Sequence, residues 1–261
     1  MRPLSALTAE EARRIDKLAF DLDDTLLSNG KLEECAYSAL FRLQSAGFTL
    51  IASTGRPASF AEVAVRQWPI QAAIAENGGV AYHCLEGPLT KLDTCPSDTR
   101  RDRRARLQAF TESLCAEFPE LHLADDNHGR ITDVAFDIGE RHRVAAEVVE
   151  SARQLARTNG FRTFCSNIHM HLTLDAFDKA TGFAALMSNL NLDPVRELRR
   201  AAFLGDSGND GPAFAAFGLT IGVANVRKHL AKLTVAPGFV ASSHMGRGFA
   251  EIAERLVELR A

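Results

Sequence analysis

The chain has no apolar segment that approaches the ~20 consecutive residues needed for a membrane-spanning helix. Residues 1–16 also lack the apolar stretch of a signal peptide, and Thr8 followed by Glu11 is typical of a capping box that opens a short helix. The net charge of -3 gives no reason to expect a nucleic acid partner. We therefore expect a soluble, cytoplasmic protein with neither a nucleic acid nor a membrane as partner.

Cysteine is scarce and is not arranged for a disulfide framework or a zinc site. The 5 cysteines are odd in number, widely spaced and contain no Cys-x-x-Cys pair. This pattern fits reduced thiols that pack as small hydrophobic side chains. The sequence also has no internal repeat and no low-complexity segment. With 46% hydrophobic residues over 261 positions, the chain can bury the core of one large or two modest domains.

Strand-like apolar runs alternate with helix-like segments from Lys17 to about Asn77. Such alternation is typical of βαβ units and a parallel sheet. The pattern predicts strands at 18–20, 48–53 and 70–75, helices at 32–46 and 57–68, and a hairpin over 80–93.

The pattern changes between Cys95 and Ala176, where paired strands joined by short turns alternate with helices. It predicts helices at 97–118 and 141–158 and strands at 121–124, 131–138, 161–167 and 169–175. We expect a small antiparallel sheet with helices on one face, inserted into the first domain. The basic run 100–106 is interpreted as the solvated face of the first inserted helix rather than as an anion site.

The parallel pattern returns after the insert. It predicts helices at 178–189, near 226–231 and at 248–259, and strands at 200–204, 219–223 and 233–235. The sequence therefore predicts an α/β protein with a parallel sheet core flanked by helices, residues 1–92 and 177–261, and an inserted α+β domain, residues 93–176.

Two carboxylates directly follow the first predicted core strand. Asp21 and Asp23 lie just after the apolar run 18–20, and ligands of open α/β sheets bind beyond the carboxyl ends of the strands. Adjacent acids in such a place either hold a cation or act as nucleophile and proton carrier.

Three further polar segments lie at the ends of predicted core strands or at the starts of the following helices: Thr54-Gly55-Arg56, Lys179, and Asp206 with Asn209 and Asp210. Several aspartates around one point repel each other unless a cation joins them, and hard oxygen ligands select magnesium. A hydroxyl, a free backbone N–H near a helix start and an ammonium group are the donors that a phosphoryl group needs. Thr54, Gly55 and Lys179 supply these donors.

These four segments, taken in order, resemble the four motifs of the haloacid dehalogenase superfamily. They are Asp21 to Thr25, Ser53 to Arg56, Lys179, and Gly205 to Asp210. An insert between the second and third motifs is similar to the Cof-type, sucrose-phosphatase-like branch, in which an α+β cap covers the site. The run Gly246-Arg247-Gly248-Phe249 also resembles sugar-phosphatase members. The resemblance implies a Rossmann-like core with an inserted cap.

The resemblance also implies a chemistry. Asp21 would attack phosphorus to form an aspartyl-phosphate, and Asp23 would act as general acid and then general base, work worth about 10²–10⁴-fold in rate. Mg²⁺ would be held by the Asp21 carboxylate, the Asp23 backbone carbonyl and Asp206, with Asp210 as support through water. Asn209 would orient the loop or Lys179. A dehalogenase would work without magnesium, and the acid-rich fourth motif disfavours that branch.

The implied function is a magnesium-dependent phosphatase acting on a small phosphorylated metabolite, with a sugar phosphate as the favoured class, as a monomer or homodimer. Two alternatives stay open: a phosphomannomutase-like phosphotransferase, and a non-catalytic protein that binds a phosphorylated metabolite. An active wild type together with an inactive Asp21→Asn variant would exclude the non-catalytic protein.

Several residues keep two interpretations at this point. Arg56 could contact substrate phosphate or a sugar hydroxyl, or could pair with a nearby carboxylate. Asn77 could touch substrate or serve only the turn. His169 and His171 share one face of a strand and could be structural or contact substrate, and Asp133 and Asp137 share that ambiguity. Asp24, where many relatives carry glycine, is expected to cap a helix or face solvent.

Overall fold

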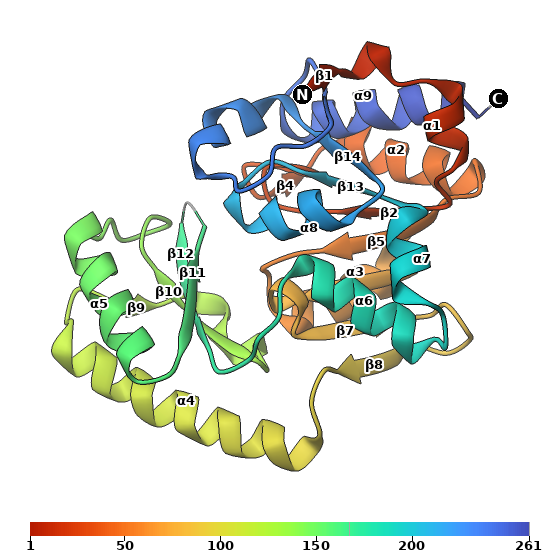
Figure 1. The fold of residues 1–261 in the computed structure, drawn as a ribbon. Coiled ribbons are helices and arrows are strands. Elements are labelled where there is room, and N and C mark those ends of the chain that lie inside the picture. Colours follow the sequence, from red (N-terminus) through yellow and green to blue (C-terminus); the bar gives the residue numbers. More distant parts are fainter. Residues whose placement is uncertain (167, 261) are drawn as a thin grey trace.

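The computed structural model describes residues 1–166 and 168–260 and shows two large sheets and one two-stranded hairpin in this part of the chain (Figure 1). The larger sheet contains, in spatial order, β1 (Arg2–Pro3), β15 (Phe239–Val240), β14 (Leu219–Gly222), β13 (Ala201–Gly205), β2 (Lys17–Phe20), β5 (Thr49–Ser53), β6 (Ala72–Ala75), β7 (Val80–His83) and β8 (Thr90–Asp93). Neighbouring strands from β1 to β6 pair in parallel, and only β7 and β8 pair antiparallel. The predicted α/β core is therefore confirmed.

Helices cover both faces of this sheet, as a buried parallel sheet requires. One face packs against α2 (Glu34–Ser45), α3 (Ala58–Gln67) and α9 (Met245–Glu258), and the short α1 (Ala9–Arg13) adds Ala12. The other face packs against α6 (Lys179–Asn189) and α8 (Gly211–Ala216), with α7 (Pro194–Arg199) at its margin. Phe20 meets Phe249 on the first face with ring centroids 5.1 Å apart, and Phe203 meets Phe214 on the second at 5.7 Å.

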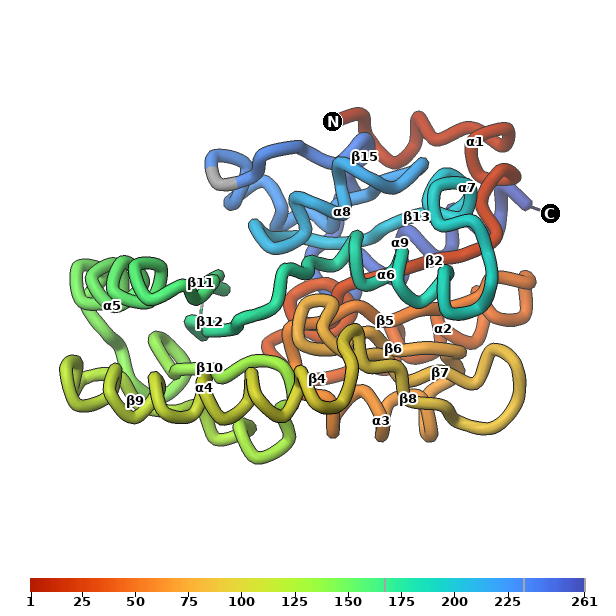
Figure 2. The backbone as a smooth tube through the Cα atoms, turned by 60° about the horizontal axis from the view of Figure 1, so that its bottom comes forward, coloured from red at the N-terminus to blue at the C-terminus, as the bar shows by residue number. Residues whose placement is uncertain are grey.

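The smaller sheet lies to one side of the core, and both chain termini lie in the core (Figure 2). Its strands are β11 (Arg162–Cys165), β12 (His169–Thr173), β10 (Asp133–Asp137) and β9 (His122–Leu123), in that order, and all described pairs are antiparallel. The helices α4 (Ser97–Glu117) and α5 (Ala146–Thr158) pack on one face. We call this unit, residues 97–173, the cap.

The two faces of the cap sheet differ because side chains alternate along a strand. Val134 and Phe136 of β10 join the apolar cluster under the helices, together with Met170 and Leu172 of β12. Asp133 of β10 points to the opposite face, where it pairs with His171 of β12. That polar face is the one turned toward the core.

Short elements complete the described chain. A hairpin of β3 (Leu27–Ser28) and β4 (Lys31–Leu32) follows the first motif, and 3-10 helices occupy Leu4–Ala6, Glu76–Gly78, Asp125–Gly129, Gly208–Asp210, Ala224–Lys228 and Leu230–Lys232. No helix within the described residues is both long enough and apolar enough to span a membrane.

Most predicted elements appear with boundaries shifted by a few residues, but the strand predicted at 233–235 is wrong. The last core strand is β15, whose Phe239 is 2% exposed, whereas Val235 is 40% exposed. Burial against the sheet, rather than β propensity, decided which segment pairs. The helix predicted near 226–231 is a pair of 3-10 helices, and α7 and α8 were not predicted. Asn167, the last residue of the strand predicted at 161–167, lies outside the described residues.

The sequence suggested that the basic run at the start of α4 is a solvated face, but one of its arginines is buried in an ion pair. Arg100 is 8% exposed, and its guanidinium contacts Asp93 at 2.8 Å and Asp175 at 2.5 Å. Arg103 also pairs with Asp175. Asp93 ends the last core strand before the cap and Asp175 follows the last cap strand. Arg100 therefore joins the two connections between cap and core.

Candidate active site

The four motif segments meet at one edge of the core sheet. The parallel strands β13, β2 and β5 are neighbours in register, so the residues after them, Asp206, Asp21 and Thr54, emerge side by side. Lys179 begins α6, whose N-terminus is fixed by a capping box between Asp178 and Thr181. The structure thus brings together side chains that lie up to 189 positions apart in the sequence, from Asp21 to Asp210.

A buried lysine joins two of the aspartates. Lys179 Nζ lies 2.6 Å from Asp21 Oδ1 and 2.6 Å from Asp210 Oδ1, and its side chain is 0% exposed. The other oxygen of Asp210 accepts hydrogen bonds from the backbone N–H groups of Asp206, at 2.8 Å, and Ser207, at 3.0 Å. Three donors therefore occupy the Asp210 carboxylate, which suits a support of the fourth motif better than a direct metal ligand.

The carboxylates of this cluster carry more negative charge than one lysine balances. Asp21, Asp206 and Asp210 are buried, and each offers an oxygen within 4.8 Å of the others. The pKa of Asp21 is raised to about 7, because burial and the nearby charges of Asp210 and Asp23 together outweigh the opposing effect of Lys179. Burial, with Asp210 and Asp21, also raises the pKa of Asp206 well above its usual range. A divalent cation with a preference for oxygen ligands would relieve this repulsion, so the donor set fits magnesium.

Asn225 belongs to this cluster and was missed by the sequence reasoning. Its amide donates to Asp206 Oδ2 at 2.8 Å and to the Asp24 carbonyl at 2.9 Å, and its own oxygen accepts the Met245 N–H at 3.0 Å. Asn225 follows β14 at the same edge of the sheet. Its place after a predicted strand was the signal that could have found it.

Asp23 is held by an arginine at the mouth of the site. Arg56 Nε donates to Asp23 Oδ2 at 2.9 Å and Arg56 Nη2 donates to Oδ1 at 2.7 Å, while the guanidinium lies 4.6 Å from the centre of the Phe60 ring. Of the two interpretations left open for Arg56, the structure shows the pairing with a carboxylate. Asp23 keeps 44% of its side chain exposed, so it stays accessible to a ligand.

Asp24 lies in a turn rather than at a helix cap. Its backbone φ is 57°, in the left-handed region where glycine is favoured and aspartate is tolerated. Because aspartate tolerates this conformation, it can stand at a position where many members of the haloacid dehalogenase superfamily carry glycine. Burial raises the pKa of its carboxyl, and the neighbouring Asp23 adds to the shift.

Two predicted substrate contacts lie behind the cavity wall. Thr54 Oγ1 accepts the Arg56 N–H at 3.0 Å and is fully buried. Asn77 accepts a hydrogen bond from Asn209 at 3.1 Å, and its side chain packs 3.1 Å from the place that a Cβ on Gly55 would occupy. In this geometry both residues support the loop Gly55-Arg56 and neither lines the cavity.

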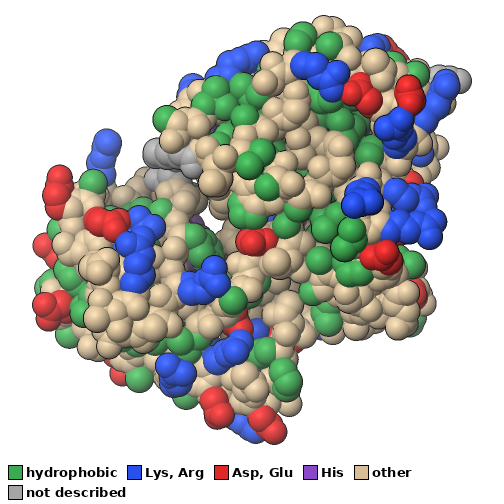
Figure 3. Space-filling view, viewed as in Figure 1, with side chains coloured by type: hydrophobic (Ala, Val, Ile, Leu, Met, Phe, Trp, Pro, Cys, Tyr) green, Lys and Arg blue, Asp and Glu red, His purple; other side chains and the backbone are tan. Residues whose placement is uncertain are grey.

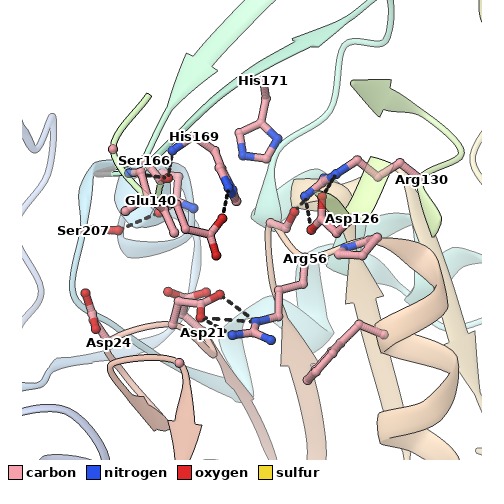
Figure 4. Close-up of a pocket in the computed structure, with 18 of the residues that line it drawn as sticks. Asp21, Asp24, Arg56, Asp126, Arg130, Glu140, Ser166, His169, His171 and Ser207 are labelled. Atoms are coloured by element: carbon pink, nitrogen blue, oxygen red, sulfur yellow. Dashed lines mark hydrogen bonds and ion pairs between the residues drawn. The ribbon is translucent and has the colours of Figure 1, made fainter. Parts of the chain in front are cut away.

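A cavity of about 810 Å³ separates these core residues from the cap, and a hollow between the two parts is visible in Figure 3. Glu140, His169 and His171 face Asp21 and Arg56 across it (Figure 4). The core side of the lining includes Asp21, Asp23, Asp24, Gly55, Arg56, Asp206 and Asn209, and the cap side includes Asp125, Asp126, Arg130, Glu140, Ser166, His169 and His171.

His169 and His171 each pair with a carboxylate and line the cavity. His171 Nδ1 lies 2.8 Å from Asp133 Oδ2, and burial lowers the pKa of this histidine. His169 Nε2 lies 2.9 Å from Glu140 Oε2. Asp137 stabilises the turn that follows β10, because its carboxylate accepts four backbone N–H groups from residues 139–142.

Comparison with known proteins supports the assignment suggested by the four motifs. Residues 18–99 match the family model for haloacid dehalogenase-like hydrolases. The matched segment contains the first two of the four motif segments, Asp21 to Thr25 and Ser53 to Arg56. This match agrees with the predicted superfamily, and the solved structures described next confirm the predicted fold class. Among curated proteins, none matches the chain at a significant level.

Solved structures extend the likeness over nearly the full length. A protein from Thermoplasma acidophilum is 21% identical with a TM-score of 0.69, covering 94% of this chain and 99% of that one. A phosphatase of this superfamily from Bacteroides thetaiotaomicron is 18% identical with a TM-score of 0.69, covering 98% of each chain. The sucrose-phosphatase of Synechocystis, solved with sucrose and phosphate, is 19% identical with a TM-score of 0.67, covering 93% and 97%. At these identities the likeness establishes the fold.

Proposed function

We propose that this protein is a haloacid dehalogenase-like hydrolase, and that it is a magnesium-dependent phosphatase that cleaves a small phosphorylated metabolite of the sugar phosphate class. Its core domain would be residues 1–92 and 177–261, and the inserted domain that contains the cap would be residues 93–176. The observation that carries the proposal is the buried cluster of Asp21, Lys179, Asp206 and Asp210, with Asp21 and Asp206 opening onto a cavity beside Asp23.

The reaction would take place in two displacements. In the first, an Asp21 oxygen bonds to phosphorus, the bond from phosphorus to the leaving oxygen breaks, and Asp23 gives that oxygen a proton. In the second, water attacks the phosphorus, Asp23 takes a proton from it, and the bond between phosphorus and Asp21 breaks to release phosphate. Lys179, 2.6 Å from Asp21, keeps this carboxylate oriented and compensates part of its charge.

Magnesium would be held by Asp21, Asp206 and the backbone carbonyl of Asp23, with Asp210 and Asn225 fixing the loop and the Asp206 side chain. When bound, it would neutralise charge on the phosphoryl oxygens. The case for this ion is the excess negative charge of three buried carboxylates beside one lysine.

The cap side of the cavity supports a hydroxyl-rich leaving group. Asp125, Asp126 and Glu140 offer carboxylate oxygens there, which accept hydrogen bonds from sugar hydroxyls. Among the described lining residues, the two cations, Arg56 and Arg130, are already paired with carboxylates, Arg56 with Asp23 and Arg130 with Asp126 and Asp133. A second anionic group on the substrate would therefore be repelled by these carboxylates, and both arginines are already engaged in ion pairs. The likeness to a sucrose-phosphatase points to the same class.

A panel of phosphomonoesters tests this function. We expect release of inorganic phosphate from sugar monophosphates such as glucose 6-phosphate and sucrose phosphate in preference to nucleotides, acyl phosphates and phosphoglycerate. Activity should disappear after exhaustive chelation and return when Mg²⁺ is added.

Each alternative gives a different result in the same assay. A preference for nucleotides or acyl phosphates would overturn the sugar phosphate proposal, and full activity in excess chelator would overturn the metal requirement. Isomerised sugar phosphate without phosphate release would identify a phosphotransferase. Binding without turnover of any ester would indicate a non-catalytic protein.

A further inference from the structure

The carboxylate of Glu76 bonds to the core and to the cap at once. It is 0% exposed. Its oxygens accept the N–H of Ala58, at the start of α3 in the core, at 3.0 Å. From the cap they accept the Ile131 N–H at 2.9 Å, the Thr132 N–H at 2.5 Å and the Thr132 hydroxyl at 2.6 Å. Four donor groups from two parts of the protein therefore converge on one buried anion.

The backbone of the same turn is bonded to the active-site loops. The Glu76 N–H donates to the Arg56 carbonyl at 3.0 Å and the Asn77 N–H donates to the Thr54 carbonyl at 2.9 Å. Glu76 and Asn77 have φ angles of 52° and 56°, an uncommon conformation for residues other than glycine that surrounding contacts must hold in place. The second motif and this turn thus form one bonded unit.

The turn also adjoins both connections between core and cap. The Gly79 carbonyl accepts the Thr94 hydroxyl at 2.9 Å in the first connection. In the second, the backbone approaches so closely that a Cβ on Gly78 would lie 2.3 Å from the Asp178 carbonyl oxygen. Residues 76–79 therefore contact both connections between core and cap.

From Thr132 the contacts continue into the cavity. Its neighbour Arg130 donates to the Gly55 carbonyl at 3.0 Å and to Asp133 Oδ1 at 3.0 Å, and Asp133 pairs with His171 at 2.8 Å. His171 lines the cavity opposite Asp21. The residues that hold His171, namely Arg130 and Asp133, therefore flank the Glu76 contacts of Ile131 and Thr132.

We propose that Glu76 is a positioning residue, which fixes the angle between cap and core and so the fit between the cap lining and a phosphoryl group bound at Asp21. The inference rests on the proposed phosphatase function and adds a residue that touches no substrate. Because one buried anion serves donors on both sides, loss of a donor in the cap is felt in the core.

The test removes one donor on the cap side without changing side-chain shape. Thr132→Val deletes the hydroxyl bonded to Glu76, and Thr132→Ser restores it. Thr111→Val is the matched control, because Thr111 is also a buried cap threonine, but its hydroxyl bonds only to Leu107 within α4. Two probes are compared: p-nitrophenyl phosphate, whose leaving group reaches toward the cap, and acetyl phosphate, whose leaving group is small.

For Thr132→Val we expect kcat/KM with p-nitrophenyl phosphate to fall about tenfold, as for loss of a hydrogen bond to a charged group, mainly through KM. With acetyl phosphate, kcat/KM should change by no more than about twofold, which is a small part of the free energy of the lost hydrogen bond to Glu76. Thr132→Ser should recover the first value and Thr111→Val should alter neither. Equal losses with both probes, or no recovery in Thr132→Ser, would overturn the proposal.

Amide hydrogen exchange gives a readout that does not need turnover. In Thr132→Val, exchange should rise at the Ala58 N–H across the interface as well as at Ile131 and Thr132. A rise confined to the cap would contradict the coupling through Glu76. If the wild type hydrolyses neither probe, the proposed function fails, and the exchange measurement still decides the role of Glu76.

Discussion

Replacing Asp21 by asparagine is expected to abolish turnover, with kcat lower by a factor on the order of 10³ or more, as for loss of a nucleophile in covalent catalysis. The amide cannot form the bond to phosphorus, although it fills the same space beside Lys179. The measurement is steady-state phosphate release at saturating Mg²⁺. Substantial remaining activity would mean that another group is the nucleophile.

The same variant should fold at least as stably as the wild type when no metal is present. Burial raises the pKa of Asp21 to about 7, so folding disfavours its charged form. The wild type therefore loses stability as pH rises from the ordinary aspartate pKa of about 4 toward 7, and asparagine removes this loss. Thermal unfolding at pH 8 would check it. Asp16→Asn, at the other end of β2, is the control and should leave kcat unchanged.

Replacing Lys179 by methionine is expected to have the largest effect on stability, because two buried carboxylates then lose their shared cation. Removing one partner of a buried ion pair typically costs about 3–5 kcal/mol in the free energy of unfolding. Activity should fall as well, since Asp21 loses its orienting contact. Denaturant unfolding with and without Mg²⁺ measures the cost, and the added ion should recover part of it.

Lys17 provides the matched control for this experiment. It also contacts two carboxylates, Asp16 at 3.1 Å and Glu197 at 2.5 Å, but at the opposite end of β2 and with more solvent access. Lys17→Met should cost less stability and leave kcat unchanged. A Lys179→Met variant within about 1 kcal/mol of the wild type, the range of an exposed ion pair, would contradict the charge balance described for the cluster.

The core and the buried acidic cluster could be predicted because local pattern and sheet geometry both determine them. Apolar runs such as 18–20 must be buried, and parallel strands bring their carboxyl ends to one edge, so Asp21 and Asp206 had to meet. The capping box at Thr8 and the hairpin over 80–93 were local features and were found for the same reason.

The residues that were missed depend on contacts between distant segments. Glu76 follows a strand like any turn residue, and nothing in the sequence shows that its charge is fully buried against residues 131 and 132. Arg100 lies within a run of arginines, and only the approach of Asp93 and Asp175 makes it a buried ion pair. For Asn77 the sequence left a substrate contact and a turn role open, and the structure packs its side chain against Gly55. Such partners are set by tertiary packing rather than by spacing.

A crystal structure with Mg²⁺ and vanadate tests the central claim most directly. The account predicts a metal ion about 2.1 Å from oxygens of Asp21 and Asp206, and vanadium bound to the other Asp21 oxygen with Asp23 near its opposite side. A metal bound away from Asp206, or vanadate that contacts no oxygen of Asp21, would contradict it.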